Sequence, residues 1–85
     1  MEPEAIRSRL EAMVEDFEAR ANTRDGIVPQ ETISVVEALL NAAKEAVPGD
    51  VVVQAVSIRP RATYADIYPP LRQVVLALPR FIGIG

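Results

Sequence analysis

The chain has 85 residues and contains no cysteine, no histidine and no tryptophan. Without cysteine it cannot form a disulfide, so a fold this small depends on its hydrophobic core alone. A structural zinc site is close to excluded, because such sites use cysteine and histidine ligands. The commonest general base and the strongest nucleophile are missing as well. We therefore expect no metal, no cofactor and no enzymatic activity.

Recognisable catalytic and phosphate-binding motifs are also absent, including G-x-S-x-G, G-x-x-x-x-G-K-[ST] and G-x-G-x-x-G. Most acidic residues fall on predicted solvent-facing sides of helices, where they increase solubility. Asp66, which lies between Tyr64 and Tyr68, is the one place to look for a catalytic acid or base. A capping aspartate in a turn with two half-buried tyrosines is the simpler interpretation.

Long apolar runs are also missing, so we expect no membrane-spanning helix. The first residues are acidic and lack the early apolar segment of a signal peptide. The absence of cysteine fits the reducing environment of the cytoplasm. We therefore expect a cytoplasmic protein.

What the chain does contain is a large hydrophobic fraction, 49%. A chain of this length buries only about 60–65% of its unfolded surface. This combination favours a homo-oligomer or a stable protein partner, which would add buried area. A compact monomer that uses many alanine and valine residues is the alternative.

The charges are unevenly distributed along the chain. Residues 1–50 contain eleven of the twelve acidic residues and five of the nine basic ones. Two solvated acidic helices followed by a basic loop would explain this distribution. Ends of opposite sign could also steer head-to-tail pairing.

Residues 1–49 predict an acidic helical hairpin. The first helix is expected from Glu2 to Ala21, with Pro3 in its first turn and one apolar stripe. That stripe consists of Ile6, Leu10, Met13, Val14, Phe17 and Ala21. The turn residues 22–26 would make the next helix, within 28–49, an antiparallel neighbour.

The second helix is apolar on more than one side. Its first stripe consists of Ile33, Val36, Leu40, Ala43 and Val47. Its second stripe consists of Val35, Leu39, Ala42 and Ala46. A surface helix of a monomer normally needs only one stripe, so the second one must be covered by the rest of the chain or by another subunit.

Residues 50–68 predict a β/turn segment, because Val51 to Ile58 is rich in β-branched residues. Such a strand needs a partner, either residues 62–68 or the same strand of a second subunit. A short third helix capped by Asp50 is the alternative.

Residues 69–85 predict a short helix and an apolar tail. Tyr68 precedes a proline and should be extended, so the helix is expected from Pro70 to Leu78. A strand over residues 73–78 is the alternative. The tail from Phe81 would dock on a subunit or partner, unless it continues into a longer protein.

Together these patterns predict a single α+β domain dominated by helices, with an all-α fold of four short-to-medium helices as the alternative. The function we expect is that of a small non-catalytic assembly or adaptor protein that self-associates or docks on a larger partner. The residues expected to form its contact surface are Val35, Leu39, Ala46, Val51, Val53, Phe81 and Ile82.

A nucleic-acid-binding or regulatory module is the second hypothesis. Its anion-binding residues would be Arg59, Arg61, Tyr64 and Arg72. Arginines can contact phosphates and tyrosines can stack on bases. Four cations are few, however, and the acidic first half would repel a polyanion. A nucleic acid is therefore the less favoured partner.

Overall fold

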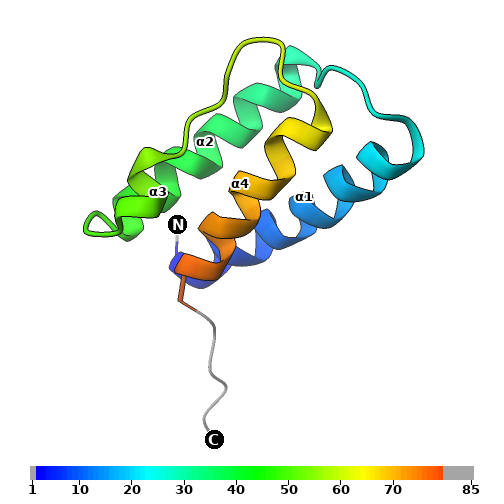
Figure 1. Cartoon of the computed structure of the whole chain (residues 1–85). Coiled ribbons are helices and arrows are strands. Elements are labelled where there is room, and N and C mark those ends of the chain that lie inside the picture. The colour runs from blue at the N-terminus through cyan, green and yellow to red at the C-terminus, as the bar shows by residue number, and fades with distance from the viewer. Residues whose placement is uncertain (1, 80–85) are drawn as a thin grey trace, which may run out of the picture.

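A computed structural model describes residues 2–79 and shows four helices (Figure 1). These are α1 (Pro3–Arg24), α2 (Gln30–Ala46), α3 (Val51–Ala55) and α4 (Tyr64–Ala77). Within residues 2–79 there is no sheet, only an isolated antiparallel bridge between Ile27 and Thr63. The all-α alternative is therefore the better description, and the expected β segment is not observed. Nor does any helix in this range have the length and hydropathy needed to cross a membrane.

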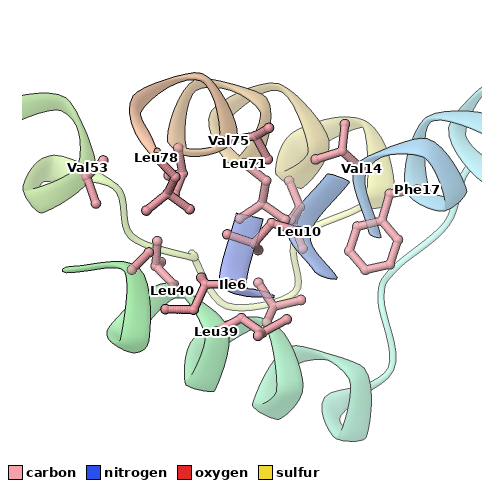
Figure 2. Close-up of a cluster of buried hydrophobic side chains, with 14 of the residues drawn as sticks. Ile6, Leu10, Val14, Phe17, Leu39, Leu40, Val53, Leu71, Val75 and Leu78 are labelled. Carbon is pink, nitrogen blue, oxygen red and sulfur yellow. The ribbon is translucent and has the colours of Figure 1, made fainter. Parts of the chain in front are cut away.

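The first two helices form the expected antiparallel hairpin, and α4 packs along α1 beside α2 (Figure 1). Side chains from all four helices meet in one core (Figure 2), together with Val28, Ala62 and Leu78, which lie outside the helices. The largest fully buried side chains are Ile6, Leu10, Val36, Val53, Ile67, Leu71 and Val74. The core lies between α4 and the hairpin, so α4 covers one side of the hairpin.

Residues 51–55 form the short helix α3, and their prediction as a strand is wrong. The side chain of Asp50 caps this helix by accepting a hydrogen bond from the N–H of Val53, at 3.0 Å. The side chain of Gln54 donates to the carbonyls of Lys44 and Val47 at the end of α2. Only Val53 on this helix is buried. Since residues 2–79 provide no partner strand, the cap and the local hydrogen bonds outweigh the β propensity of the valines.

Helix α4 begins six residues earlier than expected and runs through Pro69 and Pro70. Tyr68, expected to be extended, is helical. Both prolines lack the N–H that would bond to the carbonyl four residues earlier, which weakens this turn. The helix continues because it is capped before the prolines and because Ile67 and Leu71, one turn apart, are both fully buried.

Candidate interaction surface

Five large hydrophobic side chains are exposed among the described residues. They are Ile27, Val35, Val51, Val52 and Leu76. Val35 differs from the others because it lies in the middle of a helix and lines an apolar groove beside a second helix.

This groove lies between α1 and α2 and has a volume of about 330 Å³. Its lining residues are Arg9, Ser34, Val35, Ala38, Leu39 and Ala42, and we call it the α2 groove. Val35 is 53% exposed on its wall, whereas Leu39 is only 7% exposed. Ser34 donates its hydroxyl to the carbonyl of Gln30, at 3.1 Å, so its donor is already used. The groove is therefore mainly aliphatic, with one charged residue on its α1 side.

A smaller hollow of about 200 Å³ continues the α2 groove toward the end of α2. Its lining residues are Pro3, Ile6, Ala42, Glu45 and Ala46. Ala42 is common to both hollows. Ser34, Ala38 and Ala42 recur every four residues and have short side chains, so this face of α2 can be approached closely.

The structure separates the seven residues expected to form a contact surface. Val35 and Leu39 line the α2 groove, and Ala46 lines the adjoining hollow. Val51 is 80% exposed but lies at the start of α3. Val53 is fully buried in the core, so it is not available to a partner.

The two remaining members of that set, Phe81 and Ile82, lie outside the described residues. Sequence reasoning did not select Arg9, Ser34 or Ala38, which also line the α2 groove. The repeat of small side chains every four residues along α2 is the sequence pattern that could have identified Ala38.

The expected anion-binding residues do not form one basic surface. Arg72 pairs with Glu18 at 2.9 Å, and its guanidinium lies 5.5 Å from the ring centroid of Tyr68. Arg72 also lines a hollow that contains two acidic residues of α1, Glu11 and Glu15. These acidic side chains beside Arg72 would repel a polyanion.

Two of the other members of that set are engaged in contacts of their own. Tyr64 packs edge-on against Phe17, with ring centroids 5.1 Å apart, and lies beneath Arg20. Arg59 pairs with Asp66 at 2.6 Å. Arg61 is exposed in a turn, has a positive φ of 59° and lines the same hollow as Arg59.

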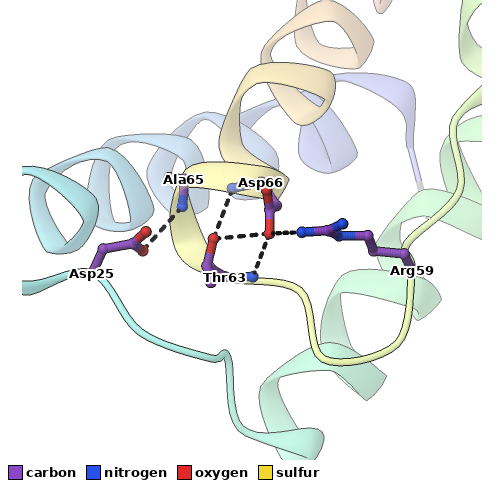
Figure 3. A network of polar contacts seen from close by, with 5 residues as sticks. All are labelled: Asp25, Arg59, Thr63, Ala65 and Asp66. Carbon is purple, nitrogen blue, oxygen red and sulfur yellow. Dashed lines mark hydrogen bonds and ion pairs between the residues drawn. The ribbon is translucent and has the colours of Figure 1, made fainter.

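Asp66 caps α4 (Figure 3). Its Oδ2 accepts hydrogen bonds from the N–H of Thr63 at 3.0 Å, from the hydroxyl of Thr63 at 2.9 Å and from Nη2 of Arg59 at 2.6 Å. These hydrogen bonds lower the pKa of Asp66 to about 2, and the bond from the Thr63 backbone has the largest effect, with that from Arg59 next. The carboxylate is thus ionised and its Oδ2 accepts from three donors, so we assign it a structural role in capping α4.

Among residues 2–79, no three acidic side chains come together in a way that could hold a metal ion. Comparisons of the chain with protein-family models, with curated proteins and with solved structures found no match. Function must therefore be inferred from the surface of the molecule itself.

Proposed function

We propose that this protein is a small, non-catalytic assembly protein that self-associates through the α2 groove. The observation that supports this proposal is the half-exposed Val35 beside the aliphatic lining of that groove. Covering apolar surface of this kind is favourable by about 25 cal/mol per Å². An 85-residue chain with a thin core would gain buried area that it cannot supply by itself.

The composition of the groove favours a protein surface over a small polar substrate. A substrate site usually combines an apolar pocket with several convergent polar groups. In the α2 groove, the hydroxyl of Ser34 is already bonded and Arg9 is the remaining polar side chain. Apolar helix faces fit such a surface through side-chain packing alone.

Light scattering over a range of protein concentrations tests this proposal. We expect a mass above that of the 9.3 kDa chain at high concentration, falling toward it on dilution. Val35→Asp should remain monomeric throughout, because it places a charge in the apolar contact.

Val52→Asp is the matched control. Val52 is also 53% exposed, but it lies in the first turn of α3, where an acidic side chain is tolerated. This variant should associate like the wild type, and circular dichroism should show that both variants are folded. A wild-type monomer at every concentration would contradict self-association. An oligomer that Val35→Asp leaves unchanged would show that another surface is used.

A further inference from the structure

The α2 groove and the adjoining hollow each have one charged lining residue, and the two charges are of opposite sign and lie on different helices. Arg9 lines the groove from α1. Glu45 lines the adjoining hollow from α2. Both side chains are exposed, and neither forms an ion pair with another residue in the range 2–79. An apolar strip thus runs between Arg9 on α1 and Glu45 on α2, and the described part of the chain neutralises neither charge.

We propose that a second copy of the chain occupies the groove, related by a two-fold axis that runs along it. This inference rests on the self-association proposed above and specifies its geometry. With the axis in this direction, α1 of each copy lies over α2 of the other. The α1 side of each groove then faces α2 of its partner, so that Arg9 approaches Glu45 of the partner subunit. The symmetry makes this ion pair occur twice.

The positions of the two residues along the helices are compatible with this pairing. Arg9 shares the groove with Ala38 and Leu39. Glu45 lies about two helical turns beyond Ala38, or roughly 10 Å at 1.5 Å per residue. Extended arginine and glutamate side chains together span such a separation. The short side chains along this face of α2 leave room for the opposing helix to approach.

Charge complementarity favours a second copy over a partner whose facing surface has one sign of charge. A uniformly acidic surface would be repelled by Glu45, and a uniformly basic one by Arg9. A second copy carries one charge of each sign, and the two-fold symmetry places each charge opposite one of the other sign. Arg9 and Glu45 would therefore determine the specificity of the interface, while the apolar strip supplies most of the buried area.

A charge-exchange experiment tests this arrangement. In Arg9→Glu alone, each interface would contain two facing pairs of glutamates, and in Glu45→Arg alone, two facing pairs of arginines. We expect each single variant to dimerise at least about tenfold more weakly than the wild type, because like charges face each other. An equimolar mixture of the two variants should form a heterodimer, because one of its two pairs is the original Arg9–Glu45 pair and the other is the same pair with its signs exchanged. Native mass spectrometry distinguishes this heterodimer when one variant carries a mass tag.

Arg24→Glu is the control, because Arg24 is exposed at the far end of α1. It should dimerise like the wild type and should not rescue Glu45→Arg. If the wild type dimerises and Val35→Asp disrupts the dimer, but mixing Arg9→Glu with Glu45→Arg restores nothing, the two-fold arrangement is wrong and self-association stands. If both single variants dimerise as the wild type does, the proposed ion pair is absent. A wild type that never dimerises overturns the proposed function itself.

Discussion

At the scale of single residues, Arg7 is the one charged side chain buried among residues 2–79. Its Nε donates to the carboxylate of Glu11 at 2.8 Å, and its Nη1 donates to the carbonyl of Leu78. Leu78 caps the end of α4, where helix carbonyls lack partners and a cation is favourable. Arg7 therefore joins the beginning of α1 to the end of α4.

We expect Arg7→Met to lower the free energy of unfolding by about 1–3 kcal/mol, because the carbonyl of Leu78 would lose its charged donor in a buried position. Methionine keeps much of the apolar stem, so the change reports mainly on the polar contacts. Urea unfolding followed by circular dichroism measures the effect. Arg24→Met, at an exposed position, should change the value by less than about 0.5 kcal/mol. Equal losses in the two variants would contradict this role for Arg7.

The capping carboxylate of Asp66 predicts a pH dependence of stability. Its pKa is about 2 in the folded protein, below the ordinary value of 3.8. Between these values the unfolded chain binds more protons, so stability from this group is present above pH 3.8 and is lost as the pH falls toward 2. We expect Asp66→Asn to lower the melting temperature at pH 7, with the difference from wild type shrinking below pH 3.8. A difference that is the same at pH 7 and at pH 2 would argue against this assignment.

At the scale of secondary structure elements, α4 shows how tertiary packing maintains a locally unfavourable sequence. Pro69 and Pro70 lie at the sixth and seventh positions of the helix, beyond the first turn where proline is well tolerated. The capping box of Thr63 and Asp66 begins the helix, and the N–H of Ala65 is bound by Asp25 at 3.2 Å. Burial of Leu71 beyond the prolines then maintains the helical path.

We expect Pro69→Ala to raise the free energy of unfolding by about 1–2 kcal/mol. The exposed alanine would restore an N–H to the carbonyl of Ala65, and this gain exceeds the entropy that proline removes from the unfolded chain. Pro3→Ala is the control, because Pro3 lies in the first turn of α1, where the missing N–H has no helical partner. It should produce no increase. Chemical denaturation compares the two, and a Pro69→Ala protein no more stable than wild type would contradict the expectation.

At the scale of the whole molecule, the uneven charge distribution is partly compensated by tertiary contacts. Arg72 in the basic C-terminal half pairs with Glu18 of α1. The exposed residues Arg9 and Glu45 are not compensated in this way within the described range. Since α4 packs on one side of the hairpin, the α2 groove on α1 and α2 is left open. The described part of the molecule thus presents an apolar strip with Arg9 and Glu45 beside it on one surface.

Much of the hairpin was predictable because helical periodicity is a local property of the sequence. The apolar stripe of α1 was assigned to the core, and Ile6, Leu10, Val14 and Phe17 are indeed buried. The first stripe of α2 was also correct at Val36, Leu40 and Ala43. The second stripe correctly identified Val35 and Leu39 as neighbours along one face, and these residues line the candidate surface.

The sequence by itself determined the helical hairpin, the stripes that its helices bury and the absence of cysteine and histidine chemistry. Only the tertiary structure decided that residues 51–55 are helical, because a strand depends on a distant partner and none is present among residues 2–79. It also decided that Val53 is buried while Val35 is exposed, since exposure depends on which helix covers each face. Arg7 shows the same limit: its spacing to Glu11 is local, whereas the carbonyl that it binds is 71 residues away.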